Sequence, residues 1–70
     1  MHESEKLYWA ILRGAHTVEI RERETGKEGV AVSGLRGILV NYGADDGSDD
    51  KTVSPDEFDR DFIVTSIIFA

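Results

Sequence analysis

The sequence contains no cysteine, one proline and only two histidines among its 70 residues. Without cysteine, the chain forms neither a disulfide nor a thiolate zinc site, which are common reinforcements of short chains. Of the two histidines, His2 stands at the terminus and His16 in an expected turn, so they form no cluster for a metal or for acid–base work. Stability must therefore come from the apolar core, from another kind of metal site or from a partner subunit.

Catalytic motifs are also absent. No serine stands in a nucleophile-elbow context, and no glycine-rich loop has a phosphate-binding pattern, because the spacing of Gly34 and Gly37 is too short. The carboxylates cluster in a hydrated stretch, where their pKa values are not driven toward catalytic ones. We therefore predict that the protein is not an enzyme and carries no cofactor.

Length and net charge limit the class of protein to which this chain can belong. Seventy residues make one small domain, residues 1–70, with a net charge of −6. The first six residues are polar and acidic, unlike a signal peptide, and no apolar run is long enough for a membrane helix. We expect a cytoplasmic protein. An acidic surface also argues against direct binding to nucleic acid or to anionic membranes.

Four segments have the composition and spacing of β-strands. They are rich in β-branched and aromatic residues, and glycines separate them. A turn at 25–29 and a tight bend at 34–37 each contain two glycines, which suits hairpin connections. The predicted strands are 17–24, 29–33, 38–42 and 62–69.

The segment 7–12 is apolar on both faces, so its pattern fits two structures. It could form a short helix with Ser4 as N-cap and Gly14 just beyond the end. It could also form a strand, which its aromatic and isoleucine content favours. Residues 17–24 look like a hairpin partner, and for that reason we favour the strand. Trp9 is then expected in the core, and Tyr8 must face the other way.

A capping box gives the sharpest local signal in the chain. Ser54 is the expected N-cap, Pro55 occupies the first helical position and Glu57 the third. The helix must be brief, because the β-branched segment 62–69 follows it. The sequence therefore predicts a mainly β domain: a small five-stranded barrel or β-roll with one short helical turn before the last strand.

This layout resembles small SH3-like β-barrel proteins of the phage and prophage type. The residues that carry the resemblance are Ser54, Pro55, Asp56, Glu57 and Phe58, followed by the apolar start of the last strand at 62–64. The resemblance implies a size and an architecture. It does not by itself imply a function.

The acidic residues are concentrated in one stretch, residues 45–61. Eight acids and two bases give it a charge of −6, whereas the rest of the chain sums to zero. A localised charge of this kind can steer a basic partner, as small phage-encoded inhibitors do. We predict a protein-binding module that docks on a basic protein surface, with Tyr8 and Tyr42 as adjacent anchors. The acidic residues of the predicted site are Asp45, Asp46, Asp49, Asp50, Asp56, Glu57, Asp59 and Asp61.

A calcium site in the same stretch is the first alternative. A twelve-residue loop that starts at Asp46 places Ser48, Asp50 and Glu57 at positions where an EF-hand accepts oxygen ligands. Lys51, however, stands where the sharp turn requires glycine. The capping box already explains Glu57. The simpler interpretation is a solvated acidic turn that holds no metal.

Self-association is the second alternative. Strict alternation along the last strand places one apolar set, Phe62, Val64 and Ile68, on one face, and a second set, Ile63, Ile67 and Phe69, on the other. A small barrel cannot easily cover both faces, so a second subunit that pairs along this strand would bury one of them. This predicts a homodimer or a structural assembly role.

Overall fold

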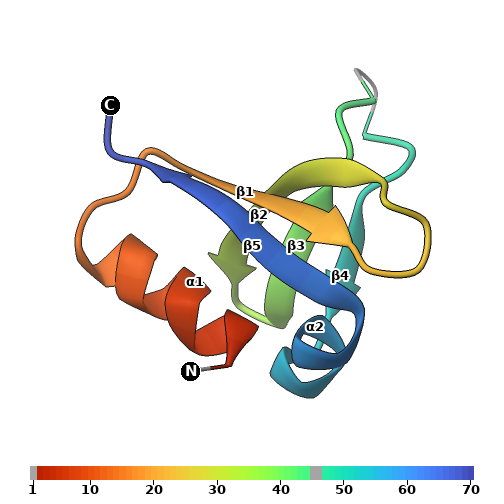
Figure 1. The fold of residues 1–70 in the computed structure, drawn as a ribbon, viewed down its shortest axis with the longest axis horizontal. Coiled ribbons are helices and arrows are strands. Elements are labelled where there is room, and N and C mark those ends of the chain that lie inside the picture. Colours follow the sequence, from red (N-terminus) through yellow and green to blue (C-terminus); the bar gives the residue numbers. More distant parts are fainter. Residues whose placement is uncertain (1, 45–46) are drawn as a thin grey trace.

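The computed structural model describes residues 2–44 and 47–70. Within them the chain forms two helices and five strands (Figure 1). In chain order the elements are α1 (Glu3–Leu12), β1 (Thr17–Glu22), β2 (Glu28–Gly34), β3 (Gly37–Asn41), β4 (Lys51–Val53), α2 (Pro55–Asp61) and β5 (Phe62–Ile68).

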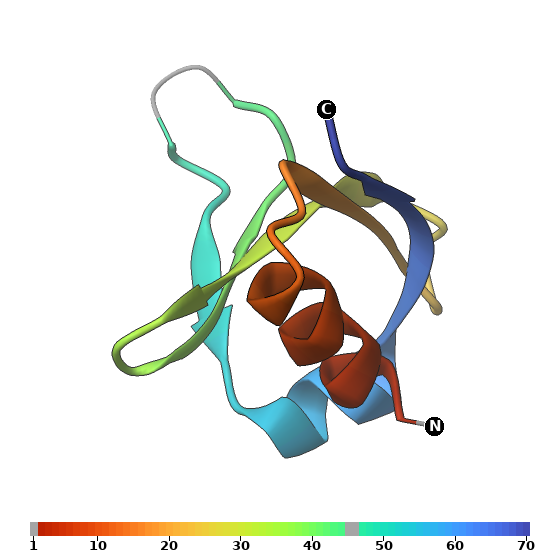
Figure 2. The ribbon, with the colours of Figure 1, turned by 90° about the vertical axis from the view of Figure 1, so that its left-hand side faces the viewer.

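The five strands form one antiparallel sheet in the order β4-β3-β2-β1-β5. The sheet is strongly curled, and both helices lie on its concave side (Figure 2). A mainly β, five-stranded fold is confirmed. Closure into an SH3-like barrel is not, because β4 and β5 remain separate edges that are joined in sequence by α2.

The prediction of a strand at 7–12 is wrong, because this segment belongs to α1. Leu7 and Ala10 lie three residues apart, on one face of the helix, and both are completely buried. The helix begins at Glu3, one residue before the expected N-cap Ser4, and Glu5 accepts a hydrogen bond from the His2 N–H at 3.2 Å. The pattern looked apolar on both sides because Tyr8, 40% exposed, lies outside the core face.

The fifth strand is β4, which the sequence did not suggest. Its three residues lie inside the acidic stretch, and only Val53 of the three is buried. Pairing with β3 places Val53 beside Ile38 and Lys51 beside Val40. The expected hairpin partner of β1 is also different: β1 lies between β2 and β5. A strand this short is specified by its neighbour in the sheet more than by its own composition.

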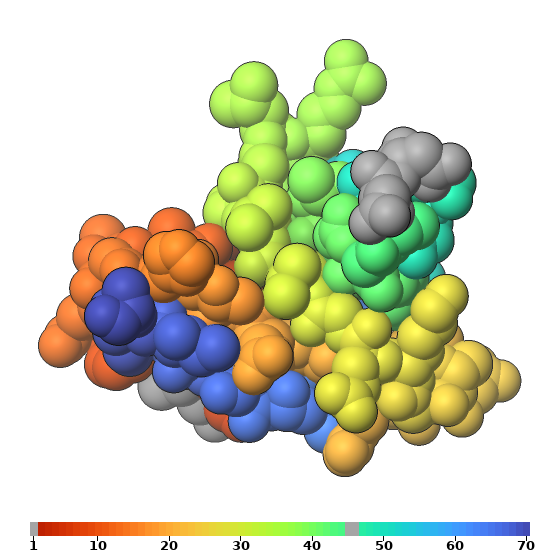
Figure 3. All heavy atoms as spheres, turned by 90° about the horizontal axis from the view of Figure 1, so that it is seen from above, coloured from red at the N-terminus to blue at the C-terminus, as the bar shows by residue number. Residues whose placement is uncertain are grey.

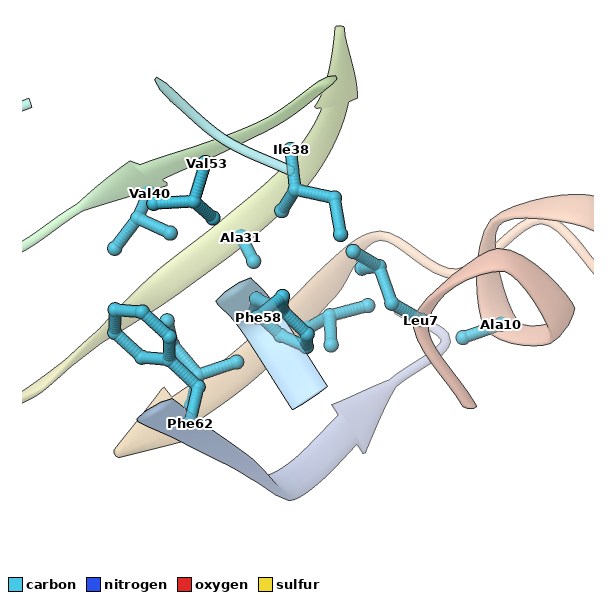
Figure 4. Packing of buried hydrophobic residues seen from close by; sticks show 10 residues of the cluster. Leu7, Ala10, Ala31, Ile38, Val40, Val53, Phe58 and Phe62 are labelled. Atoms are coloured by element: carbon cyan, nitrogen blue, oxygen red, sulfur yellow. The ribbon is translucent and has the colours of Figure 1, made fainter. Parts of the chain in front are cut away.

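The core fills the space between the curled sheet and the two helices (Figure 4). Phe58 of α2 and Phe62 of β5 stack at its centre, with ring centroids 5.3 Å apart. The other members are Leu7, Ala10, Val18, Ile20, Ala31, Ile38, Val40 and Val53.

The bend expected at 34–37 is confirmed as a two-residue connection between β2 and β3. Gly34 pairs with Gly37, and Leu35 at the tip is fully exposed. The hairpin projects from the body of the molecule (yellow-green in Figure 3). Gly37 has φ +143°, and a Cβ there would lie only 2.6 Å from the Val53 carbonyl oxygen. Glycine is therefore required for β4 to lie close to β3.

A β-bulge changes the faces of β5. Ile20 pairs with Val64 and Glu19 pairs with Ser66, so Thr65 is an extra residue in the strand. After the bulge, Ile67 packs against the core and Ile68 is 41% exposed. The assignment by strict alternation was therefore wrong for these two residues, because one extra residue reverses the side on which all later residues lie.

The helical turn before the last strand is confirmed as α2. Ser54 is its N-cap, and its hydroxyl accepts a hydrogen bond from the Glu57 N–H at 3.1 Å. Pro55 occupies the first turn, where its missing N–H costs nothing. The cap positions Phe58 in the core, so local helix chemistry and tertiary packing agree here.

We predict that Ser54→Ala lowers the free energy of unfolding by about 1 kcal/mol, because the Glu57 N–H loses its acceptor. Urea denaturation followed by circular dichroism measures the difference. Ser33→Ala removes a hydroxyl from an exposed position of β2 and serves as control, with an expected change within about 0.5 kcal/mol. Equal losses in both variants would contradict the role assigned to the cap.

Candidate functional site

The structure divides the acidic stretch between two ends of the molecule. The β3–β4 loop lies at one end and α2 at the other, with β4 between them (Figures 1 and 2). Asp49 and Asp50 belong to the loop, and the four later acids belong to α2. Asp45 and Asp46 lie outside the described residues. The described acids of this stretch therefore fall into two separate groups, one on the loop and one on α2.

Two acids of α2 are used inside the protein. Asp59 Oδ1 accepts a hydrogen bond from the Ser4 N–H at 2.7 Å and so anchors the first turn of α1. This contact holds the pKa of Asp59 below its ordinary value. Asp61 receives a two-pronged contact from the Arg60 guanidinium at 2.8 and 2.9 Å, and its carbonyl accepts the Arg23 N–H. The Asp59 carboxylate is therefore structural and the Asp61 carboxylate is paired with its neighbour at the surface, which the charge pattern did not reveal.

Three other acids of the predicted site face solvent. Asp50, Asp56 and Glu57 are exposed and form no ion pair within the described part of the chain. Glu57 makes only a long contact, 3.5 Å, with the Ser54 hydroxyl. Asp49 is partly buried. These exposed carboxylates are accessible to a partner.

The two predicted tyrosine anchors differ in environment. Tyr8 is 40% exposed on α1, away from the β3–β4 loop (Figure 1). Tyr42 follows β3 at the start of that loop and is partly buried against Phe62, with ring centroids 6.5 Å apart. The structure therefore places only Tyr42 beside the loop acids.

Tyr42 is also held by a polar network. Its hydroxyl donates to Glu22 Oε2 at 2.7 Å, and the Thr25 hydroxyl donates to Glu22 Oε1 at 2.9 Å. The Lys27 ammonium lies 4.5 Å from the centre of the tyrosine ring. Burial raises the pKa of Tyr42, and the hydrogen bond that its hydroxyl donates to the Glu22 carboxylate raises it further. Tyr42 packs against the core and is only partly buried, and its role as an anchor stays a prediction.

Next to this network is a shallow groove that the sequence analysis missed. It has a volume of about 470 Å³ and collects charged residues from β1, the turn after it, β4 and the end of α2. Lys51 lies 3.6 Å from Glu22, and Arg60 contacts Asp61, so the groove's charges largely satisfy one another. The lining residues are Glu22, Arg23, Glu24, Lys51, Arg60 and Asp61. Alternating charges along 19–24 were its only sequence signal.

The calcium hypothesis stays a prediction, because its first ligand, Asp46, is outside the described residues. Ser48 and Asp50 lie in the β3–β4 loop, whereas Glu57 lies beyond β4 on α2 (Figure 1). No group of three or more potential protein ligands for a metal occurs within residues 2–44 and 47–70. The described part of the stretch thus holds its carboxylates apart.

Comparison with protein-family models, with curated proteins and with solved structures finds no match for this chain. Neither α1 nor α2 has the length and apolar character that a membrane-crossing helix requires, and the described residues contain no other helix. Arguments about function therefore depend on the surface of this chain itself.

We predict that Asp59→Ala lowers the free energy of unfolding by about 1–2 kcal/mol, because it leaves the part-buried Ser4 N–H without its acceptor. Asp59→Asn keeps an acceptor and costs less. Asp56→Ala, an exposed change in the same helix, is the control and should stay within about 0.5 kcal/mol. Urea denaturation distinguishes the three variants.

The same carboxylate should contribute to acid sensitivity. Its pKa is lowered in the folded state, so its stabilisation is complete above the ordinary value of 3.8 and is lost as the pH falls through the lower folded value. In this acid range the melting temperature should fall less steeply with decreasing pH for Asp59→Asn than for the unmodified protein. Identical slopes would show that Asp59 contributes no such linkage.

We predict that Tyr42→Phe costs about 1 kcal/mol, because Glu22 keeps its contacts with Thr25 and Lys51. The folded protein should also show a late tyrosinate absorbance step that this variant lacks and that Tyr8→Phe retains. The stabilisation of the folded state by the neutral Tyr42 hydroxyl is complete below pH 10.0, the ordinary pKa of tyrosine. It is lost as the pH rises through the raised pKa of the folded state. Loss of the late step in Tyr8→Phe would contradict this assignment.

Proposed function

We propose that the protein is a small acidic binding module, without catalytic activity, that docks on a basic protein surface. The observation that carries this proposal is that some acids of the stretch have partners within the protein whereas others are exposed. Asp59 and Asp61 are engaged internally, while Asp50, Asp56 and Glu57 stay exposed and without ion pairs in the described part of the chain.

Unpaired surface carboxylates contribute to recognition by raising the association rate and the specificity for a partner. Like charges on one partner accelerate encounter with a surface of opposite sign and disfavour wrong partners. At moderate salt, dissolved ions screen the attraction between exposed charges that are more than about 10 Å apart, so such binding must weaken as salt rises. An inhibitor or adaptor of the phage type, which competes with nucleic acid for a basic surface, fits this chemistry.

The placement of the acids also determines which part of this protein a partner must cover. Asp50 and the α2 pair, Asp56 and Glu57, lie on either side of β4 (Figure 1). A partner that engages both groups must cover the β4 edge of the sheet. That edge is only three residues long and includes Lys51, so backbone pairing would add little. We therefore expect charge, and not strand addition, to dominate the contact.

The test is the triple variant Asp50→Asn, Asp56→Asn, Glu57→Gln, compared with the charge-matched control Glu19→Gln, Glu24→Gln, Glu28→Gln, whose residues are also exposed. A basic protein captured on the immobilised wild type, eluted by salt and then purified, is the probe. Its affinity for each variant is measured by calorimetry at low and at high salt.

We expect the triple variant to bind at least about tenfold more weakly than the control at low salt, with the difference shrinking as salt rises. Equal binding by both variants at low salt would show that these carboxylates only solvate the protein. Failure of the wild type to retain any basic protein would contradict the proposed function as a whole.

A further inference from the structure

The outer face of α1 carries an apolar stripe that no described element covers. Tyr8, Trp9 and Leu12 are 40%, 44% and 86% exposed. They belong to the series Glu5, Tyr8, Trp9, Leu12 and Arg13, spaced i, i+3, i+4, i+7, i+8 along the helix. This spacing is typical of the helix face that packs against another protein layer, yet here it faces away from the sheet. Trp9, expected in the core, lies at the middle of the stripe.

The stripe has the composition of a binding surface. Tryptophan, tyrosine and arginine are the residue types that contribute most to protein–protein contacts. The Arg13 guanidinium lies 4.8 Å from the centre of the Trp9 ring, so the two side chains form one stacked unit. Glu5 and Arg13 form no ion pair within the described part of the chain.

The charges of the stripe identify its partner. Glu5 and Arg13 stand four residues before and four residues after Trp9, roughly 12 Å apart along the helix axis. A second α1 that runs antiparallel across a two-fold axis at Trp9 would place Glu5 of each copy against Arg13 of the other. We propose that this face, the α1 stripe, binds a second copy of the same chain in that antiparallel arrangement.

The overall charge distribution permits this pairing. The −6 charge resides entirely in residues 45–61, and the remainder of the chain is neutral. The β3–β4 loop lies away from α1 (Figures 1 and 2). Two copies joined through the α1 stripe therefore keep their loop acids apart, which limits like-charge repulsion, whereas the acids of α2 lie nearer the contact because α2 packs against α1.

Pairing along the last strand, the other route to a dimer, is obstructed by a side chain. The Val64 N–H on the free edge of β5 donates to Glu3 Oε1 at 2.7 Å, and the Lys6 ammonium holds Glu3 Oε2 at 2.9 Å. The Glu3 side chain is only 11% exposed. A partner strand would have to displace this buried contact, so the α1 stripe is the more accessible surface.

Concentration-dependent sedimentation tests the proposal, and Trp9 supplies a second readout because it is the sole tryptophan of the sequence. The stripe is small beside a standard interface, so we expect a dissociation constant on the order of 10–100 µM. Trp9 emission should shift to shorter wavelength over the same range. A protein that remains monomeric at about 1 mM overturns the proposal.

Trp9→Ala should weaken the dimer at least about tenfold. Leu35→Ala removes a more exposed apolar side chain from the β2–β3 hairpin and should leave the dimer unchanged. Because Trp9→Ala removes the fluorophore, both variants are compared by sedimentation. Equal association by Trp9→Ala and wild type would exclude the α1 stripe.

Charge reversal tests the orientation. The homodimers of Glu5→Arg and of Arg13→Glu should each dissociate, because like charges then meet at both symmetry-related contacts. An equimolar mixture of the two variants should form a heterodimer, in which opposite charges meet at both contacts. The neutral variants Glu5→Gln and Arg13→Gln, which disturb the helix ends less, should each weaken the dimer several-fold. Thermal melts verify that every variant is folded. A mixture that stays monomeric, or neutral variants that associate like wild type, would overturn the antiparallel arrangement.

Discussion

The docking of α1 into the open side of the sheet is the constraint on which the rest of the structure depends. An open, curled sheet leaves its concave face without cover, and the chain has no disulfide to compensate. Leu7 and Ala10 fill that face from α1, while Phe58 fills it from α2. Two carboxylates then tie the first turn of α1 in place: Asp59 through the Ser4 N–H, and Glu3 through the Val64 N–H.

This docking explains why the acidic stretch is not a uniform surface. Once Asp59 anchors a helix and Asp61 holds Arg60, the charge left for a partner belongs to acids with no internal contact. A count of charges overstates the binding surface, because it cannot distinguish a carboxylate that accepts a backbone N–H from one that meets only water. The exposed acids belong to the β3–β4 loop and α2, whereas the stripe belongs to α1, so the two proposed contacts involve different elements.

Local chemistry was predictable where one short segment contains all of the interacting groups. The Ser54 cap and Pro55 specify the start of α2, and the glycine pair at 34 and 37 specifies a tight hairpin. Predictions failed where distant residues decide. The three residues of β4 are a strand because β3 lies beside them, and the bulge at Thr65 reverses the faces of β5 through pairing with β1.

The sequence by itself determined a mainly β fold with a capped helical turn before the last strand, and it places all of the net charge in one stretch. Only the tertiary structure decided that residues 7–12 are helical, since a segment apolar on all sides suits either conformation and the open side of the sheet required a helix. Tertiary structure also decided which acids have partners within the protein. The physical reason is the same in both cases: burial and hydrogen bonding depend on neighbours that are remote in the chain.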